Sequence, residues 1–497
     1  MPTEKELIKE RLKKLEEIRK LGVNPYPYKY EYSASAEEVN SKYKDLQKEE
    51  HTKDTVKIAG RLMALRRMGK ATFAHVMDNT GKIQLYFQID NMGKDEYKFL
   101  KLLDIGDWIG AEGTIFKTKT GEVTVEVKKA ELLSKSIKPL PEKWHGLKDK
   151  EARYRHRYLD LIMNPEIKQV FINRTKIIDT IRDVLNRKGF LEVDTPVLQP
   201  IYGGAAARPF KAHLNELDMP VYLRISDELY LKRLIVGGFE KVYEFSKDFR
   251  NEGIDRTHNP EFTQIEIYQA YADFNDMKEL VQDLYVAAAM AIHGKTKFKF
   301  GEHEIDVKKP WQEYTMVESL KKFADIDAEG MSDEDLMDLA DSHGIEMPQR
   351  TRGWAINGLF EELVEEKLIQ PTLITHHPVE TTPLCKHCRH HPESHYIERF
   401  EPFIAGMEIA NAYSELNDPI LQRKYLEEQA KELREGSDES HPMDEDFIQA
   451  IEYAMPPTGG IGIGIDRMCM IILNQLSIRD VLFFPFMKPE HEEEKKE

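Results

Sequence analysis

The sequence has few cysteines and no long apolar run. Only three cysteines occur in 497 residues, too few for a disulfide framework, so a reducing compartment is expected. No run approaches the roughly 18 apolar residues of a membrane span, and the charged N-terminus lacks the apolar core of a signal peptide. We therefore predict a cytoplasmic protein that does not associate with a membrane.

Two familiar nucleotide-binding motifs are also missing. No G-x-x-x-x-G-K-[S/T] loop occurs, which argues against a P-loop NTPase. The glycines at 460, 462 and 464 begin like a dinucleotide fingerprint, but position 465, where the third glycine is needed, is Ile. Any ATP site must therefore bind the nucleotide through a different motif.

The length of the chain predicts more than one domain, since a single core rarely grows so large. Its net charge of −17 argues against a coat of nucleic acid but leaves room for a local basic surface. The sequence pattern divides the chain into five parts. These are an N-terminal helical extension (1–50), a small β-barrel of the oligonucleotide-binding type (51–138), a proline-marked linker (139–150), a larger domain (151–490) and a charged tail (491–497).

The two domains are predicted to have different folds. A helix at 4–21 either caps the barrel or touches a phosphate backbone through its basic residues. In the larger domain, the strong apolar stripe at 166–188 predicts a helix that ends at Gly189. Strand-like segments there come in neighbouring runs, which favours an α+β domain with an antiparallel sheet.

A strand–loop–strand segment is the first candidate for an ATP site. Alternation places Phe262, Gln264, Glu266 and Tyr268 on one face of the second strand. Arg250, at the end of the first strand, can point to the same side. An arginine neutralises phosphate charge and an aromatic ring stacks on a base, although a surface hairpin would show the same alternation.

Carboxylates suggest a cation site and an ammonium site. Ala405-Gly406 predicts a two-residue turn that pairs Glu408 with Phe403 and puts Glu401 on the same face. Two carboxylates so placed can share Mg²⁺. Asn411, Tyr413 and Glu415 alternate along the next stretch, but their parity differs from that of Glu408, so a bulge or bend is expected. A carboxylate at 415 suits a cationic substrate side chain, because a buried ammonium needs an anion.

Several strings resemble one enzyme family. F-R-N-E-G-I-D-R-T-H-N-P-E-F at 249–262 and G-G-I-G-I-G-I-D-R at 459–467 resemble motifs 2 and 3 of the class II aminoacyl-tRNA synthetases. E-P-F-I-A-G-M-E-I-A-N-A-Y-S-E-L-N-D at 401–418 and E-L-Y-L-K-R-L at 228–234 are similar to segments of the lysyl-tRNA synthetases. The resemblance extends from about residue 10 to 489. It implies activation of L-lysine with ATP to lysyl-adenylate, followed by transfer of lysine to the 3′ end of tRNA(Lys).

The resemblance also implies roles for individual residues. Arg250 and Arg467 would be the catalytic residues, and Glu401 and Glu408 the ligands of Mg²⁺. The implied ATP-binding set is Arg250, Glu252, His258, Phe262, Glu401, Glu408 and Arg467. The implied lysine-binding set is Gly204, Glu228, Arg250, Glu266, Tyr268, Asn411, Tyr413 and Glu415. Glu415 and Tyr268 would receive the ε-ammonium, and Gly204 and Glu228 would lie near the α-amino group.

The resemblance implies two macromolecular partners as well. In the barrel, Arg61, Arg66, Phe73 and Gln84 would contact the anticodon of tRNA(Lys), with Phe73 and Gln84 reading its central uridine. The helix 166–188 and the strand that leads to Asp194 match motif 1, which builds a homodimer interface in the family.

One loop departs from the family pattern. Cys385 and Cys388 form a C-x-x-C string with histidines nearby, which is a zinc-type pattern. No second C-x-x-C occurs, so we expect reduced, unligated thiols near the active site rather than zinc.

Three other functions share parts of these patterns. Aspartyl- or asparaginyl-tRNA synthetases have the same barrel and motifs, but Glu415 and Glu228 argue against them. Ligases that lysylate a protein factor lack the barrel. An RNA-binding paralogue without catalysis would normally have lost Arg250, Glu266, Glu408 or Arg467, all of which are present.

Overall fold

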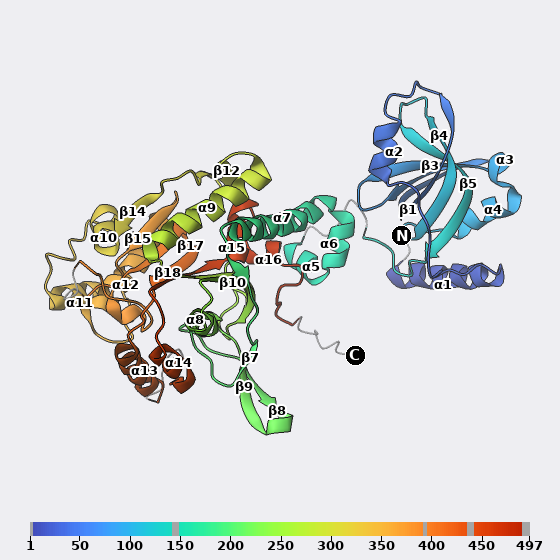
Figure 1. Ribbon diagram of the computed structural model, residues 1–497. Helices are drawn as coiled ribbons and strands as arrows, with labels where there is room; N and C mark the ends of the chain where they lie inside the picture. The colour runs from blue at the N-terminus through green and yellow to red at the C-terminus, as the bar shows by residue number, and fades with distance from the viewer. Residues whose placement is uncertain (1–2, 142–148, 391–394, 435–441, 490–497) are drawn as a thin grey trace. The chain divides into compact units, whose positions relative to one another are not determined.

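The computed structural model describes residues 3–141, 149–390, 395–434 and 442–489. The chain forms two compact units, Met1–Lys148 and Asp149–Glu497, whose elements are labelled in Figure 1. The tail expected at 491–497 and most of the linker expected at 139–150 lie outside the described residues. Within these residues, no helix is both long and apolar enough to cross a membrane.

The first unit is a closed barrel with strand order β1-β2-β3-β5-β4. Alternate residues such as Ala74 and Val76 of β2 and Leu85 of β3 fill its interior, and closure leaves no free sheet edge. This confirms the expected OB-fold. Its elements are α1 (Glu4–Lys20), α2 (Ala36–Lys42), β1 (His51–Met68), β2 (Ala71–Met77), β3 (Lys82–Gln88), α3 (Ile89–Met92), α4 (Lys94–Phe99), η1 (Leu100–Leu102), β4 (Trp108–Lys117) and β5 (Val123–Ser134).

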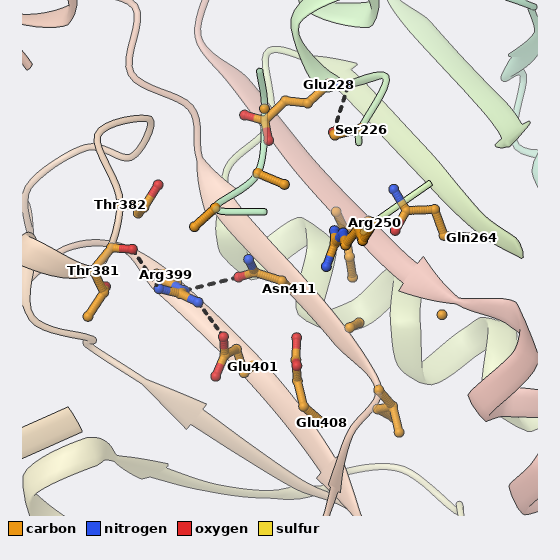
Figure 2. A pocket seen from close by; sticks show the side chains of 18 of the residues that line it. Ser226, Glu228, Arg250, Gln264, Thr381, Thr382, Arg399, Glu401, Glu408 and Asn411 are labelled. Atoms are coloured by element: carbon orange, nitrogen blue, oxygen red, sulfur yellow. Dashed lines mark hydrogen bonds and ion pairs between the residues drawn. The ribbon is translucent and has the colours of Figure 1, made fainter. Parts of the chain in front are cut away.

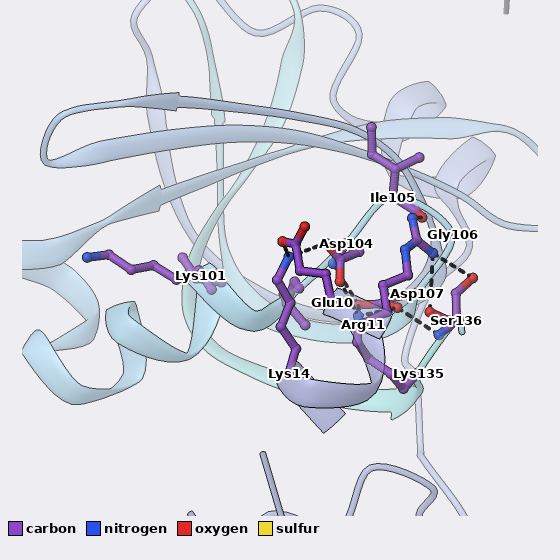
Figure 3. Close-up of polar contacts among 12 residues, drawn as sticks. Glu10, Arg11, Lys14, Lys101, Asp104, Ile105, Gly106, Asp107, Lys135 and Ser136 are labelled. Atoms are coloured by element: carbon purple, nitrogen blue, oxygen red, sulfur yellow. Dashed lines mark hydrogen bonds and ion pairs between the residues drawn. The ribbon is translucent and has the colours of Figure 1, made fainter. Parts of the chain in front are cut away.

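Helix α1 is fastened to the barrel by a partly buried polar network (Figure 3). The guanidinium of Arg11 donates hydrogen bonds to the backbone carbonyls of Ile105, Ser136 and Lys138 at 3.0–3.2 Å. Beside it, the buried ammonium of Lys135 contacts Asp104 at 2.6 Å and Asp107 at 2.9 Å. Of the two roles expected for this helix, the structure therefore supports the one that caps the barrel.

The second unit is built around a nine-stranded, largely antiparallel sheet with the order β14-β15-β16-β18-β19-β11-β10-β6 and β17 beside β16. Only the outer pairs β14–β15 and β10–β6 are parallel, which confirms the α+β class. The strands are β6 (Leu191–Glu192), β10 (Lys241–Phe249), β11 (Glu261–Ala270), β14 (Gln312–Thr315), β15 (Thr372–Thr375), β16 (Arg399–Ile404), β17 (Met407–Glu408), β18 (Ala410–Ser414) and β19 (Thr458–Gly464).

The other elements of this unit surround the sheet. Two small sheets contain β7 (Leu198–Gln199), β8 (Lys211–Leu214) and β9 (Met219–Leu223), and β12 (Lys297–Phe300) and β13 (His303–Asp306). The α-helices are α5 (Lys150–Arg155), α6 (Arg157–Met163), α7 (Pro165–Arg187), α8 (Glu228–Val236), α9 (Phe274–His293), α10 (Met316–Ala324), α11 (Asp333–Ser342), α12 (Arg352–Leu363), α13 (Pro419–Arg434), α14 (Glu445–Glu452), α15 (Ile465–Ile472) and α16 (Ile478–Val481). Three short 3₁₀ helices are described in this unit: η2 (Asn215–Leu217), η3 (Glu365–Lys367) and η4 (Val379–Thr381).

The two faces of the sheet have different roles. On one face, Ile265 and Ile267 of β11 are fully buried in the main core, which includes residues of α7, α9 and α15. Figure 1 shows α7 and α9 together on this face. Because side chains alternate along a strand, Glu266 and Tyr268 point to the opposite face. That second face carries the candidate site.

Candidate active site

The face of the sheet opposite α7 and α9 contains a cavity of about 570 Å³. In the sheet, β19 from the end of the sequence lies next to β11 from the first half of the unit. Residues far apart in the sequence therefore line the same cavity. The cavity brings together every residue predicted to bind ATP, metal or lysine: Gly204, Glu228, Arg250, Glu252, His258, Phe262, Glu266, Tyr268, Glu401, Glu408, Asn411, Tyr413, Glu415 and Arg467.

Both arginines predicted to bind ATP lie in this cavity. The Arg250 guanidinium lies 5.0 Å from the centre of the Phe262 ring, and its Nε has no hydrogen-bond partner among the described residues. Arg467, on α15, donates from Nη1 to the Glu408 carbonyl at 2.6 Å, and its Nη2 lies 3.1 Å from His258 Nε2. Two guanidiniums beside a half-buried aromatic ring suit a ligand that combines phosphates with a base.

The hairpin between β16 and β17 holds the two predicted metal carboxylates. Ala405 and Gly406 both adopt positive φ, at 54° and 69°, as a tight hairpin turn requires. Phe403 pairs with Glu408, which confirms the predicted register. Burial raises the pKa of Glu408 and the neighbouring Glu401 raises it further, whereas Arg467 and Arg399 lower it. Two mutually repelling carboxylates are the hard oxygen donors that Mg²⁺ prefers, so these residues fit that ion.

Three carboxylates at the other end of the cavity are buried. Glu228, Glu266 and Glu415 are 4%, 7% and 0% exposed. Burial raises the pKa of Glu415 to about 8, and Lys232 opposes this effect. The Tyr268 hydroxyl donates a hydrogen bond to Glu266 Oε2 at 3.2 Å. This end of the cavity is rich in buried carboxyl groups, which suits a ligand that carries ammonium groups.

Two glycines leave room for these carboxylates. A Cβ atom on Gly460 would lie 2.1 Å from Glu415 Oε1, which no side chain could tolerate without displacement. Gly204 has φ +90°, and a Cβ there would lie 2.9 Å from Ser226 Oγ. That hydroxyl in turn accepts a hydrogen bond from the Glu228 backbone N–H at 3.1 Å. The missing side chains therefore shape this carboxyl-rich end of the cavity.

In the barrel, the structure groups three of the four predicted anticodon residues. Phe73 on β2 is directly opposite Arg66 on β1, and His75 is opposite Gln84 on β3. Their neighbours Ala74 and Leu85 point into the barrel, so Phe73 and Gln84 lie on its outer side, where Gln84 is only 8% exposed and donates a hydrogen bond to Glu122 Oε2 at 2.6 Å. The Phe73 ring packs on the Tyr86 ring, with 4.8 Å between the two ring centres. These residues form an aromatic and polar surface that suits unpaired bases.

Arg61 lies elsewhere on the barrel. It pairs with Met77, four residues further along β2 than Phe73. Its guanidinium donates to the Gly106 carbonyl at 2.9 Å and lies 4.8 Å from the Trp108 ring centre. Of the two arginines expected to contact the anticodon, Arg66 therefore lies beside Phe73 and Arg61 does not.

Comparison with known proteins identifies the family. Residues 149–488 match the model of class II tRNA synthetases (D, K and N), and residues 56–133 match the OB-fold nucleic acid binding domain. A lysine–tRNA ligase of Clostridium perfringens is 51% identical over 97% of this chain and 96% of its own length. Those of Pelotomaculum thermopropionicum and Oceanobacillus iheyensis are 51% and 50% identical, over 97% and 96% of this chain and 95% and 97% of their own lengths. The chain belongs to the class II lysine–tRNA ligases.

In this synthetase, sequence reasoning missed one arginine of the cavity. Arg399 on β16 donates from Nε to Asn411 Oδ1 at 3.1 Å and forms an ion pair with Glu401. Figure 2 shows it between Thr381, Asn411 and Glu401. Residues 399 and 401 are two apart on one strand, so their side chains lie on the same face of the sheet. Because the sequence already placed Glu401 on the cavity face, the same alternation could have predicted Arg399 there.

Two further carboxylates of the synthetase cavity had no usable sequence signal. Glu361 of α12 and Glu365 of η3 line the cavity, and burial together with Glu408 and Glu401 raises the pKa of Glu365 to about 7. They come from a segment for which we predicted no element.

The unusual cysteine loop of this family member lies behind Glu415. Cys385 is buried and forms an isolated β-bridge with Glu415. His387, the nearest described histidine in sequence, has its Nε2 2.8 Å from the Tyr425 hydroxyl, and His391 lies outside the described residues. Within the described residues, no group of three or more metal-binding side chains includes Cys385 or Cys388. The geometry gives no support to zinc binding, and the reduced state of these thiols stays a prediction.

Proposed function

We propose that the protein activates L-lysine with ATP to give lysyl-adenylate and pyrophosphate, and then transfers lysine to the 3′ end of tRNA(Lys). The observation that carries this proposal is the position of Glu415. It is a fully buried carboxylate in the same cavity as Arg250 and Phe262. A substrate with an anionic side chain would instead need a cation at that position.

Positioning and charge neutralisation account for the first step. Arg250, whose Nε is unpaired among the described residues, would hold the lysine carboxylate and the α-phosphate together. Arg467 would contact the γ-phosphate side of ATP, and Phe262 would pack on adenine. Mg²⁺, held by Glu401 and Glu408, would neutralise phosphate charge. These residues lower the barrier by alignment and electrostatics, and no protein nucleophile is required.

The amino-acid subsite is formed by the buried carboxylates. Glu415 and Tyr268 would receive the ε-ammonium of lysine, and Glu228 with the backbone at Gly204 would receive its α-ammonium. Asn411 would help Arg250 to hold the carboxylate, while Glu266 and Tyr413 complete the walls of this subsite. A diamino acid is therefore bound at both of its ammonium groups.

The remaining assignments concern partners and compartment. The outward face with Phe73 and Gln84 would read the anticodon of tRNA(Lys). Exposed apolar side chains in the segment matching motif 1, including Ile172 and Leu191, which are 52% and 49% exposed, support a homodimer interface there. The three free cysteines fit the reducing cytoplasm.

The test is ATP–pyrophosphate exchange with each of the twenty amino acids. We expect L-lysine to stimulate exchange strongly and the other amino acids to give little. Stimulation by aspartate or asparagine would overturn the proposed specificity. Absence of exchange with any amino acid would favour an RNA-binding protein without catalysis.

A further inference from the structure

A lysine of the chain itself lies between two carboxylates of the amino-acid subsite. Lys232 is one turn after Glu228 on α8, and its ammonium forms ion pairs with Glu228 and with Glu415, the latter at 2.5 Å. The side chains of Lys232 and Glu415 are completely buried. Both carboxylates line the cavity, whereas Lys232 is not among its described lining residues. Its ammonium therefore lies within the wall and does not occupy the space of a ligand.

The two oxygens of Glu415 have different surroundings. Oε2 contacts the Lys232 ammonium. Neither oxygen accepts a hydrogen bond from the described residues, but only Oε2 has the ion pair with Lys232. Oε1 lies over the α-carbon of Gly460, next to the Tyr268 ring. Lys232 thus engages one oxygen and leaves the other to accept a hydrogen bond from a ligand.

The charges of this subsite match a substrate with two ammonium groups. Glu228, Glu266 and Glu415 carry three negative charges when ionised, and Lys232 contributes one positive charge. Two negative charges are left, which the α- and ε-ammonium groups of lysine balance. The carboxylate of lysine is balanced separately by Arg250.

We propose that Lys232 is a positioning residue for amino-acid selection. It orients Glu228 and Glu415 and leaves the pocket with the net charge that a diamino acid neutralises. This inference rests on the proposed function, because it assumes that lysine is the substrate. Lys232 does not touch the substrate and acts only through the two carboxylates.

The electrostatics of Glu415 agree with this role. Burial raises its pKa, Lys232 is the largest opposing influence, and Glu228 adds to the rise. The other groups that interact with Glu415 are Glu266 and Tyr268 of β11, together with Cys385 and Lys386 of the adjacent loop. Removal of Lys232 would therefore raise the pKa of Glu415 further and favour its neutral form, which binds an ammonium poorly.

The experiment compares Lys232→Met with the native enzyme in ATP–pyrophosphate exchange. The substrates are L-lysine and L-6-hydroxynorleucine, which has a neutral hydroxyl in place of the ε-ammonium. We expect the ratio of kcat/KM for lysine to that for the hydroxyl analogue to fall at least about tenfold, with KM for ATP within about twofold. The decrease of KM for lysine with rising pH should move to higher pH. The charge-retaining Lys232→Arg should keep the native ratio.

The ratio separates positioning from general damage, because the fraction of folded enzyme cancels from it. An unchanged ratio in Lys232→Met, with lysine and the analogue reduced equally and no movement of the pH profile, would overturn the inference. Should Lys232→Met not fold, Lys232→Gln retains hydrogen bonding without charge and must show the same lowered ratio. If the native enzyme activates another amino acid, the proposed function fails as well. If it activates lysine and the ratio is unchanged, only the role of Lys232 fails.

Discussion

At the scale of single residues, the charge state of Glu415 leads to a pH prediction. Burial raises its pKa to about 8, so this carboxyl is largely protonated below that pH and ionised above it. Only the ionised form balances the ε-ammonium of lysine. We therefore expect KM for lysine in ATP–pyrophosphate exchange to fall as pH rises from about 6.5 to about 8.5, while KM for ATP changes much less.

A variant of the same residue supplies the control. Glu415→Gln cannot ionise, so its KM for lysine should lose this pH dependence. Removing one member of a buried charge pair costs about 3–5 kcal/mol, so KM for lysine should also rise on the order of a hundredfold or more. Equal increases of KM for lysine and ATP, or a persistent pH slope, would contradict the assignment.

Part of this residue-level description could be predicted from the sequence. Alternation and family resemblance indicated Glu415, Glu228 and Arg250, and the cavity contains all three. The ion pair between Lys232 and Glu415 could not be predicted, because it joins α8 to the end of β18 across most of the second unit. The raised pKa of Glu415 depends on burial, which only the packed fold determines.

At the scale of elements, local chemistry predicted the hairpin between β16 and β17 well. The Ala405-Gly406 turn set the pairing of Phe403 with Glu408, and the change of parity predicted an interruption before Asn411. The structure shows both features, since β17 ends at Glu408 and β18 begins at Ala410. These features depend on a few adjacent residues. Helices α8 and α12, whose residues also line the cavity, were not predicted, because their positions depend on contacts far away in sequence.

The glycines of strand β19 leave room for buried side chains of the neighbouring segments. A methyl group added at Gly460 would lie 2.1 Å from Glu415 Oε1 and 2.4 Å from the Tyr268 ring, and both groups are buried. We expect Gly460→Ala to displace them and to raise KM for lysine at least about tenfold, which corresponds to about 1.4 kcal/mol. KM for ATP should change less, as measured by ATP–pyrophosphate exchange.

Gly464→Ala is the matched comparison for this prediction. It adds the same methyl group to the same strand, but the nearest atoms are the aliphatic carbons of Arg467 at 3.7–3.9 Å, which is ordinary contact. Its effect on KM for lysine should be clearly smaller than that of Gly460→Ala. Similar effects of the two variants would indicate a general loss of strand geometry rather than a change in the lysine subsite.

At the scale of the whole molecule, the predicted lysine site and the predicted anticodon site lie in different units. The cavity that would activate lysine lies entirely within residues 149–497, and the outward face of Phe73 and Gln84 lies in residues 1–148. Composition and strand spacing were sufficient to predict a barrel followed by an α+β domain, because each unit contains its own core. Activation of lysine and recognition of tRNA should therefore be separable by mutation.

Phe73→Ala tests this separation. The Phe73 ring packs on Tyr86 outside the barrel core, so its removal should leave the fold intact and take away a surface on which a base stacks. Stacking contributes about 1–3 kcal/mol per base, so KM for tRNA(Lys) in aminoacylation should rise about 5- to 150-fold, with lysine-dependent exchange unchanged. Tyr28→Ala, which removes a fully exposed ring from the same unit, should alter neither assay. A parallel loss of exchange and aminoacylation in Phe73→Ala would mean that the barrel is required for activation, because an independent catalytic unit would keep its exchange activity whichever base the barrel failed to bind.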